Sequence, residues 1–446
     1  MNRYLIYGTG KSGVCAGDLL KRHNKEICFF DENKYFDIRR FYEENPQFKG
    51  VRVYTEDINN SELSLVDNII LSPGIALDNT NVLELKKRRK NIIGELELGF
   101  SYEKGKVIAI TGTNGKTTTT ALTGHILKAA GREAFIGGNI GVAYTSICDK
   151  TSEKSISVLE VSSFQLETIT NFAPDICGIL NLTPDHLDRH KTFENYAGIK
   201  ISLAKHLRDN GVCILNYDDS RLLSLGLKRG GDVLFFSSEN QLSSGLFLRD
   251  GKIILSVDKK ETPVIDVDKL NIVGRHNYEN AMAAAGICLS CGLSVDEIRK
   301  GLRSFEAVEH RLEFVCEKNG VAYYNDSKGT NTDAGIKAIL AMDRPIILIG
   351  GGYDKNADYS EWIKSFHGRV RHAVLIGESA RNIARCAESM GFKNYSFEDS
   401  LEGAVNYAVN YANKGDCVLL SPACASWGMF KSFEERGNLF KRLVRG

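Results

Sequence analysis

Residues 107–120, VIAITGTNGKTTTT, constrain the fold of this chain more than any other segment. A run of β-branched and small apolar residues ends at a glycine turn, and a helix-like stretch follows from residue 118 to 130. A buried strand, a glycine turn and a helix start are the layout of a phosphate-binding loop. The strict Walker spacing would put a glycine at position 110, where this chain has Ile110. The segment therefore predicts a nucleoside triphosphate site of non-standard spacing. The alternative is a glycine turn that only joins a strand to a helix.

Each part of this loop has a chemical task. Gly112 and Gly115 let backbone N–H groups approach phosphate oxygens without an intervening Cβ. Lys116 supplies a positive charge for the β- and γ-phosphates, and the Thr117 hydroxyl can ligate Mg²⁺. The nucleotide-binding residues predicted in the loop are Gly112, Thr113, Asn114, Gly115, Lys116, Thr117 and Thr118.

Length and composition limit the class of protein. A chain of 446 residues is expected to form two or three domains. A net charge of +1 gives no reason to expect a nucleic acid or an anionic membrane as a partner. No apolar run approaches the ~20 residues of a membrane span, and the first residues do not resemble a signal peptide. The 11 cysteines are scattered among apolar neighbours, which is typical of reduced thiols in a cytoplasmic protein.

The first region carries a second glycine pattern, G-x-G-x-x-G at residues 8–13, between two short apolar runs. Asp31 follows about twenty positions later, at the end of the second run. This pattern is compatible with a dinucleotide, and equally with a UDP group whose diphosphate lies at the helix N-terminus. Residues 66–75 read as another buried strand that ends in a Pro-Gly turn, where ligands of open α/β sheets bind. Candidate ligand contacts here are Lys11, Ser12, Asp31, Ser72 and Gly74.

The remaining chain alternates apolar, strand-like runs with helical stretches. We therefore predict an α/β protein of three domains, with a largely parallel sheet in the middle. The domains are a Rossmann-like region at residues 1–94, a P-loop-type region at 95–302 and a second Rossmann-like region at 303–446. Asp250-Gly251 lies between two alternating runs and predicts a hairpin at the edge of the middle sheet.

Three polar clusters follow strands of the middle region. Glu160 ends an apolar strand, where a carboxylate is costly unless it holds a metal or is paired, so a magnesium ligand and a salt-bridged core residue are both possible readings. His186 and His190 are four residues apart, but no third N or S ligand is evident nearby, and we favour His186 as a magnesium or substrate ligand and His190 as structural. Lys200 lies on an amphipathic helix and, taken alone, would be a surface charge.

Five motifs in their order resemble the Mur ligase family of ATP-dependent amide-forming enzymes: TGTNGKT, LEVSSFQL, NLTPDHLDRH, YAGIK and GRHNYENAMAA. Three C-terminal motifs, NDSKGTN, LSPACAS and FEERG, are similar to the branch of the family that adds D-glutamate. The resemblance extends over all three regions. This chain has Gly329 where one well-known member of the family has an alanine, and Gly428 where that member has an acidic residue, and neither change removes a proposed catalytic group.

The resemblance implies a role for each matching residue. Lys116 and Thr117 match the family's phosphate lysine and magnesium hydroxyl, and Glu160 and His186 match its magnesium ligands. Lys200 matches a lysine that the family carbamylates with CO₂, which would supply an anionic oxygen ligand for a hard cation. The implied catalytic residues are Lys116, His186 and Lys200, and the implied metal ligands are Thr117, Glu160, His186 and Lys200.

The substrate residues implied by the resemblance come from all three regions. The further nucleotide contacts are Asn277, Asn280, Arg311 and Asp326. The D-glutamate contacts are Lys328, Thr330, Lys355, Ser426 and Phe433. The contacts to a UDP-muramoyl acceptor are Lys11, Ser12, Asp31, Ser72, Gly74, Asn139 and His186, and on this reading the first glycine pattern serves UDP and not NAD.

We therefore expect a cytoplasmic, monomeric ligase that adds D-glutamate to UDP-N-acetylmuramoyl-L-alanine through an acyl phosphate. The expected cofactors are ATP, two Mg²⁺ ions and a carbamylated Lys200, and closure of the third domain should be needed for turnover. Three other classes compete: a P-loop kinase or NTPase, an NAD-dependent oxidoreductase, and a regulatory protein that binds a UDP-sugar. Within the family, addition of another amino acid is the main alternative.

Overall fold

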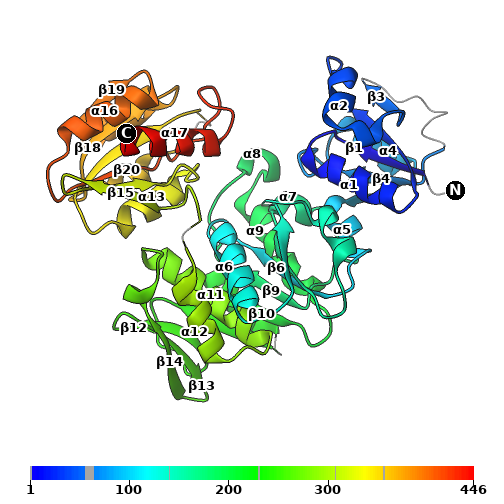
Figure 1. The fold of residues 1–446 in the computed structure, drawn as a ribbon, viewed down its shortest axis with the longest axis horizontal. Coiled ribbons are helices and arrows are strands. Elements are labelled where there is room, and N and C mark those ends of the chain that lie inside the picture. The colour runs from blue at the N-terminus through cyan, green and yellow to red at the C-terminus, as the bar shows by residue number, and fades with distance from the viewer. Residues whose placement is uncertain (1–2, 56–64, 140, 230–231, 307, 355–356) are drawn as a thin grey trace. The chain divides into compact units, whose positions relative to one another are not determined.

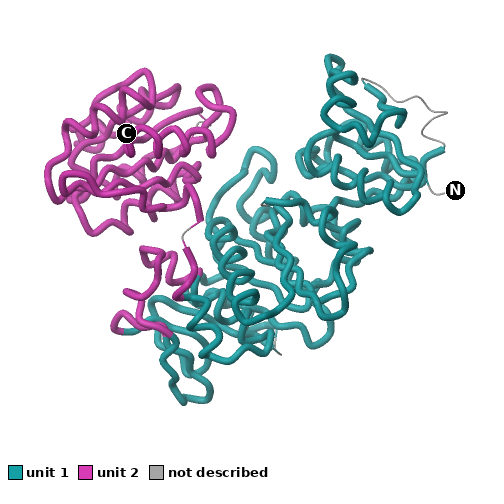
Figure 2. The backbone as a smooth tube through the Cα atoms, viewed as in Figure 1, with its two compact units in different colours: residues 1–249, 254–264, 281–302 teal, residues 250–253, 265–280, 303–446 magenta. Residues whose placement is uncertain are grey.

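The computed structural model describes residues 3–55, 65–139, 141–229, 232–306, 308–354 and 357–446. The chain separates into two compact units, which are coloured in Figure 2. Unit 1 comprises Met1–Arg249, Ile254–Val264 and Ala281–Leu302, and unit 2 comprises Asp250–Ile253, Ile265–Asn280 and Arg303–Gly446. The described residues contain three separate sheets (Figure 1). The first sheet and most residues of the second belong to unit 1, and the third sheet belongs to unit 2. The predicted α/β class with three sheet regions is therefore confirmed, and the domain boundaries at residues 94 and 302 stay predictions.

The first sheet has the order β3-β2-β1-β4-β5, and every neighbouring pair is parallel. The strands are β1 (Arg3–Tyr7), β2 (Glu26–Asp31), β3 (Val53–Thr55), β4 (Asn68–Leu71) and β5 (Asn91–Gly94), and the helices are α1 (Lys11–Arg22), α2 (Ile38–Glu44) and α4 (Thr80–Lys87). The strand order reverses between β1 and β4, so the crevice that binds ligands in such sheets lies at their carboxyl ends. The glycine pattern of residues 8–13 and the Pro-Gly turn follow these two strands.

The second sheet has nine strands in the order β14-β13-β12-β11-β10-β9-β6-β8-β7. Its strands are β6 (Lys106–Thr111), β7 (Ala134–Gly138), β8 (Ile156–Glu160), β9 (Ile176–Ile179), β10 (Val212–Asn216), β11 (Val233–Ser237), β12 (Gly245–Arg249), β13 (Lys252–Val257) and β14 (Lys260–Asp266). From β12 to β7 in this order, every neighbouring pair is parallel, and β6 lies between β9 and β8. Asp250 and Gly251 join β12 to β13 with φ angles of 48° and 69°, as a two-residue hairpin turn requires. The hairpin forms, and β14 lies outside it as the edge strand.

Helices surround the central strands of this sheet and supply most of the candidate site. They are α5 (Glu95–Phe100), α6 (Lys116–Ala129), α7 (Ser163–Leu166), α8 (Leu187–His190), α9 (Phe193–Ser202), α10 (Ser220–Arg229), α11 (Arg275–Ser290) and α12 (Val295–Ser304). The central strand β6 is buried from Val107 to Thr111, which is the apolar run that the sequence predicts. None of the helices in the described residues has the length and hydrophobicity that a membrane span requires.

The third sheet has the order β15-β16-β20-β17-β18-β19, parallel except for the β15–β16 pair. Its strands are β15 (Glu313–Lys318), β16 (Val321–Asn325), β17 (Ile346–Gly351), β18 (Val370–Ile376), β19 (Tyr395–Glu398) and β20 (Cys417–Leu420), and its helices are α13 (Thr332–Ala341), α14 (Ser360–Lys364), α15 (Ala380–Ser389), α16 (Leu401–Tyr411) and α17 (Phe433–Arg445). The strand order reverses between β17 and β20. The motifs NDSKGTN and LSPACAS follow β16 and β20, which are neighbours in this sheet.

Candidate active site

The phosphate loop joins β6 to α6 through two glycines in the left-handed region. Gly112 has a φ of 147°, and Gly115, the N-cap of α6, has a φ of 85°. A Cβ added to Gly112 would lie only 3.0 Å from the Cβ of Leu180, so this position also requires a glycine for packing. The first N–H groups of α6 have no partner within the helix, and the loop therefore offers them to an anion.

Hydrogen bonds to the segment after β9 hold the loop in place. The Thr113 and Asn114 N–H groups donate to the backbone and side-chain oxygens of Asn181, each at 2.9 Å. The Thr113 hydroxyl donates to Thr183 O and accepts from Thr183 N–H, both at 3.0 Å. Because these bonds fix the loop from outside, its shape does not depend on a bound phosphate.

Two lysines converge on this loop. Lys116 Nζ donates to the Gly112 and Thr113 carbonyls at 2.9 and 2.7 Å, so the side chain curls over the loop. Lys200, which lies on α9, donates from its Nζ to the same Gly112 carbonyl at 2.9 Å. The loop thus has two amines at its rim, in addition to the N–H groups of α6.

Lys200 is a buried residue, and the alternative of a surface charge is wrong. Its exposed fraction is 2%, and its Nζ lies 4.9 Å from the centre of the Tyr196 ring. Burial, reinforced by the nearby Lys116 ammonium, lowers the pKa of the Lys200 amine well below the usual lysine value of 10.5. A lowered pKa increases the fraction of neutral amine, which is the form that can react with CO₂.

The buried residues Thr117 and Glu160 and the exposed Asn139 form a polar cluster beside the loop. The Thr117 hydroxyl donates to Glu160 Oε2 at 2.8 Å, and Asn139 Nδ2 donates to Oε1 at 2.9 Å. Glu160 therefore accepts from two neutral donors, and no ion pair of Glu160 is found among the described residues, so the structure does not support the salt-bridge alternative there. The hydroxyl of Thr118, one residue further along α6, is buried without a hydrogen-bond partner in the described part of the chain. An orphaned hydroxyl next to the loop fits a phosphate or a metal-bound water.

His186 and His190 have different environments. His186 is the N-cap of α8 with a φ of 51°, its side chain is 42% exposed, and its Nε2 lies 3.7 Å from Asp185 Oδ2. His190 is buried, with Nε2 at 3.0 Å from the Ser163 hydroxyl and Nδ1 at 3.4 Å from Glu167 Oε1. The described residues contain no group of three or more His, Cys, Asp or Glu side chains that could hold a metal by themselves. A ligand set there would need Thr117, a modified lysine or substrate oxygens.

The candidate contacts of the first sheet meet at the carboxyl ends of β1 and β4. The Ser72 hydroxyl donates to Gly8 O at 3.4 Å, and Asp31 Oδ2 accepts from the Thr9 hydroxyl at 2.5 Å. Lys11 and Ser12 are the first two residues of α1, and the Lys11 amine donates to the carbonyl of Gly141, close in sequence to Asn139. Sequence reasoning missed a polar group at the same edge, in which the Glu32 carboxylate accepts from Tyr7, Asn79 and Asn81. The only sign of this polar group in the sequence is the acidic residue Glu32 directly after β2.

In unit 2, the predicted adenine contacts Asn277 and Asn280 begin α11. Both are buried, with exposed fractions of 2% and 4%. Asn280 Nδ2 donates to Asn277 Oδ1 at 3.0 Å, and Asn277 Nδ2 donates to Val273 O at 2.8 Å. The two amides therefore form one hydrogen-bonded pair, as the H-N-x-x-N spacing on a helix allows.

Asp326 and Arg311 lie together near the carboxyl ends of β16 and β20. Asp326 accepts from the Ser421 hydroxyl at 2.9 Å and from Leu312 N–H at 3.3 Å. Burial raises the pKa of Asp326 from 3.8 to about 6, although the Arg311 charge opposes this change. Arg311 Nε is buried without a hydrogen-bond partner in the described residues, which leaves a donor for an anion. A Cβ at Gly329 would lie 2.4 Å from Asp326 Oδ2, so the glycine makes room for the carboxylate.

Four of the five predicted D-glutamate contacts lie on the loops that follow the same two strands or at the start of α17. Lys328 Nζ lies 5.3 Å from the centre of the Phe433 ring, and Thr330 is half-buried near it in sequence. Ser426 is 4% exposed, and its carbonyl accepts from Phe430 N–H at 3.0 Å. Lys355 lies outside the described residues.

Arg436 belongs to the FEERG motif, and the sequence alone suggested no role for it. The structure makes it a candidate functional residue. The residue is 1% exposed, and its guanidinium donates to the Ser327 hydroxyl at 3.0 Å, to Ser327 O at 2.7 Å and to Cys424 O at 3.3 Å. Burial lowers its pKa from 12.5 to about 10, so the group remains charged near neutral pH. Arg436 thereby ties the NDSKGTN and LSPACAS loops to α17. No local sequence pattern predicts that this arginine is buried.

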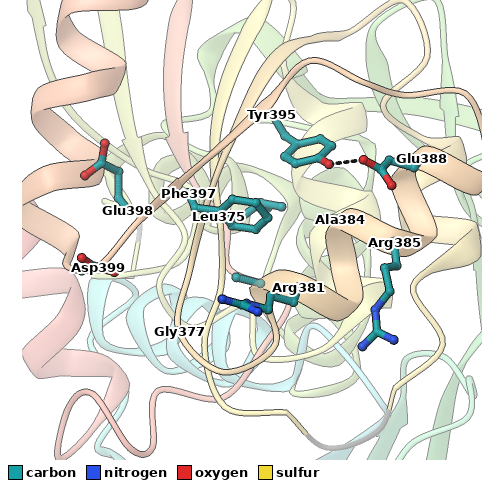
Figure 3. A pocket seen from close by; sticks show the side chains of 11 residues that line it. Leu375, Gly377, Arg381, Ala384, Arg385, Glu388, Tyr395, Phe397, Glu398 and Asp399 are labelled. Carbon is teal, nitrogen blue, oxygen red and sulfur yellow. Dashed lines mark hydrogen bonds between the residues drawn. The ribbon is translucent and has the colours of Figure 1, made fainter.

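A separate cavity of about 760 Å³ lies in unit 2 between α15 and the edge strand β19 (Figure 3). Figure 3 shows Phe397 and Leu375 at its centre, with Arg381 and Arg385 on α15. The Tyr395 hydroxyl donates to the Glu388 carboxylate across it. None of the residues predicted from the sequence to bind substrate lines this cavity.

Two family models match this chain. The model described as "Mur ligase middle domain" matches residues 110–288, and the one described as "Mur ligase, glutamate ligase domain" matches residues 310–424. The UDP-N-acetylmuramoylalanine--D-glutamate ligase of Lachnoclostridium phytofermentans is 47% identical, over 99% of this chain and 97% of its own. The protein of the same name from Lachnospira eligens is 44% identical, over 99% of this chain and 98% of its own.

Solved structures agree at the level of the fold. The UDP-N-acetylmuramate-alanine ligase MurC of Thermotoga maritima has a TM-score of 0.63 at 17% identity, over 100% of this chain and 99% of its own. The MurF ligase of the same organism, in complex with ADP, has a TM-score of 0.61 at 20% identity, over 100% of this chain and 95% of its own. The phosphate loop, the buried Thr117–Glu160 pair and the full-length relatives lead to one conclusion: this chain belongs to the Mur ligase family.

Proposed function

We propose that this protein is an ATP-dependent ligase that joins D-glutamate to UDP-N-acetylmuramoyl-L-alanine in cytoplasmic peptidoglycan precursor synthesis. Relatives that carry this activity in their names are 41–47% identical to it and align with 85–99% of the chain. The observation that carries the proposal is the buried Thr117–Glu160 pair, which lies beside a phosphate loop with Lys116 and Lys200 at its rim.

In the proposed first step, the acceptor's terminal carboxylate attacks the γ-phosphate of ATP, which gives an acyl phosphate and ADP. Negative charge gathers on the transferred phosphoryl group, and donors fixed in advance stabilise it. The groups available for this are the Lys116 amine and the N–H groups at the start of α6. In the proposed second step, the amine of D-glutamate attacks the acyl carbon, phosphate leaves, and an amide forms. The amine must lose a proton in this step.

The donor set beside the loop fits a hard divalent cation. Thr117 and Glu160 present a hydroxyl and a carboxylate 2.8 Å apart, and the Thr118 hydroxyl has no other partner in the described residues. When bound, Mg²⁺ neutralises phosphate charge and orients the triphosphate. We assign Thr117, Glu160, His186 and a carbamate on Lys200 as ligands for two such ions. A carbamate would replace an amine of lowered pKa by an anionic oxygen donor.

We assign the substrates as follows. The uridine diphosphate of the acceptor binds the first sheet, and the nucleotide contacts of unit 2 are Asn277, Asn280, Arg311 and Asp326. D-glutamate binds Lys328, Thr330, Lys355, Ser426 and Phe433. Cationic and hydroxyl groups suit an amino acid with two carboxylates.

Phosphate release in the presence of acceptor and ATP, with a panel of amino acids, tests the proposal. Release should require D-glutamate and should yield one new amide per phosphate, as mass spectrometry of the product would show. Release with L-alanine or a diamino acid but not with D-glutamate would assign the protein to another branch of the family. Release without any acceptor would indicate an NTPase.

A further inference from the structure

Arg189 connects the first sheet to the segment that carries His186, and both lie in unit 1. Its Nη1 donates to Gly74 O at 3.2 Å, and its Nη2 donates to Ile75 O at 3.0 Å. These carbonyls belong to the Pro-Gly turn after β4, 114 to 115 positions earlier in the chain. The same turn contains Ser72, whose N–H donates to Tyr7 O.

The arginine is fixed on its other side by a carboxylate and an aromatic ring. Its Nη2 donates to Glu167 Oε2 at 2.5 Å and its Nε to Oε1 at 3.3 Å, and the two side chains are 12% and 11% exposed. The guanidinium lies 4.3 Å from the centre of the Phe164 ring. Because its planar group meets two carbonyls, a carboxylate and a ring at once, a lysine could not replace it.

Phe164 extends this set of contacts to His186. The centres of the two rings are 4.9 Å apart at 60°. Glu167 Oε1 also lies 3.4 Å from His190 Nδ1, so one carboxylate contacts two consecutive residues of α8. One continuous set of contacts therefore runs from the Pro-Gly turn through Arg189 and Phe164 to the ring of His186.

We propose that Arg189 is a positioning residue that fixes the Pro-Gly turn of the first sheet against the His186 segment. By fixing the turn, Arg189 holds the bound acceptor in the orientation in which the acceptor's terminal carboxylate points at the phosphate loop. This inference rests on the proposed function and on the expectation from the sequence that Ser72 and Gly74 of the turn, and His186, contact the acceptor. An error of about 1 Å in such positioning can cost roughly 100-fold in rate.

The tie itself can be tested without substrates. Amide hydrogen exchange of the ligand-free protein should become faster at residues 72–79 in Arg189→Met, which keeps the apolar stem and removes the donors. Arg208→Met is the matched control, because Arg208 also pairs with a carboxylate, Asp175, at 3.4 Å and lies over a ring, Phe100, at 5.6 Å, but both of these partners follow the first sheet in sequence. Unchanged exchange at residues 72–79 in Arg189→Met would overturn the inference.

The consequence for substrate is tested by steady-state kinetics. Arg189→Met should lower kcat/KM for the acceptor by about 100-fold, while KM for ATP and for D-glutamate changes less than about 3-fold. Arg189→Lys, which keeps the charge and guards against misfolding of the first variant, should show the same pattern at smaller size. A KM for ATP or for D-glutamate that rises more than about 3-fold, or acceptor kinetics like those of the parent, would overturn the positioning role. A parent protein without ligase activity would instead refute the proposed function, and the exchange result would still decide on the tie.

Discussion

The Thr117 hydroxyl donates a 2.8 Å hydrogen bond to Glu160 Oε2, although the two residues are 43 positions apart. Thr117 is the second residue of α6, and Glu160 ends β8, the strand beside β6. A strand end and a helix start thus bring a hydroxyl and a carboxylate together at the phosphate loop. The hydrogen bond fixes both oxygens in the orientation in which a hard cation could bind them.

Glu160→Gln should therefore weaken magnesium binding without disturbing the loop. The amide keeps the shape and can still accept from Thr117, but it lacks the charge. Loss of a residue that only supports a metal ligand lowers metal affinity about 10–100-fold. Loss of a ligand itself should therefore raise the Mg²⁺ concentration for half-maximal activity roughly 100-fold or more. A magnesium titration of phosphate release measures this, with the exposed Glu153→Gln as control. An unchanged titration would remove Glu160 from the proposed ligands.

Lys200→Ala should be nearly inactive and partly rescued by short carboxylates such as formate or acetate. The rescue is expected because a small carboxylate can occupy the space of the proposed carbamate and restore an anionic oxygen ligand. Since the pKa of the buried amine is lowered, the neutral form that reacts with CO₂ persists to lower pH than in an exposed lysine. The exposed Lys205→Ala is the control, and ¹³C NMR with ¹³C-bicarbonate should detect the carbamate in the parent. Full activity of Lys200→Ala would exclude a carbamate role.

Asp326 should make the stability of unit 2 depend on pH. Its pKa is raised from 3.8 to about 6 in the folded state, so folding favours the protonated carboxyl. The stabilising contribution is complete below pH 3.8 and is lost as the pH rises through 6. At pH 7.5 the free energy of unfolding is therefore about 3 kcal/mol lower than at pH values below 3.8, as far as Asp326 contributes to it.

Asp326→Asn should remove this dependence, so that the difference in unfolding free energy between variant and parent rises from pH 4 to pH 6.5. The chain has 2 tryptophans, and Trp362 and Trp427 both lie in unit 2, so their fluorescence reports its unfolding in denaturant. The exposed Asp343→Asn is the control. A difference that stays constant over this range would contradict the raised pKa.

Arg436→Lys should impair D-glutamate binding while leaving the other substrates unaffected. The guanidinium holds the loops of Ser327 and Cys424 by several bonds, which the single ammonium of lysine cannot reproduce. Because the parent group stays charged at neutral pH, the change tests geometry and not charge. KM for D-glutamate should rise by about 10–100-fold, as for other supporting residues around a site. Arg442→Lys, on the same helix but exposed, is the control, and parallel increases in KM for ATP would contradict the role.

Much of the fold follows from local patterns. The apolar run before Gly112, the glycines of the loop and the start of α6 predict a strand, a turn and a helix, and the structure has all three. The Asp250-Gly251 turn is equally local, because both residues tolerate positive φ. The extra edge strand β14 was not predicted, because its sequence carries little of the apolar alternation of a half-buried strand.

The sequence alone determined the phosphate loop, the α/β alternation and, through its motifs, the resemblance to the Mur ligases. Only the tertiary structure decided that Lys200 is buried against the loop and that Glu160 pairs with Thr117. It alone revealed the buried guanidinium of Arg436 and the connection that Arg189 makes to Gly74. The reason is physical: strand, turn and helix preferences depend on neighbours in sequence, whereas burial and pairing of a charge depend on elements that packing brings together from distant parts of the chain.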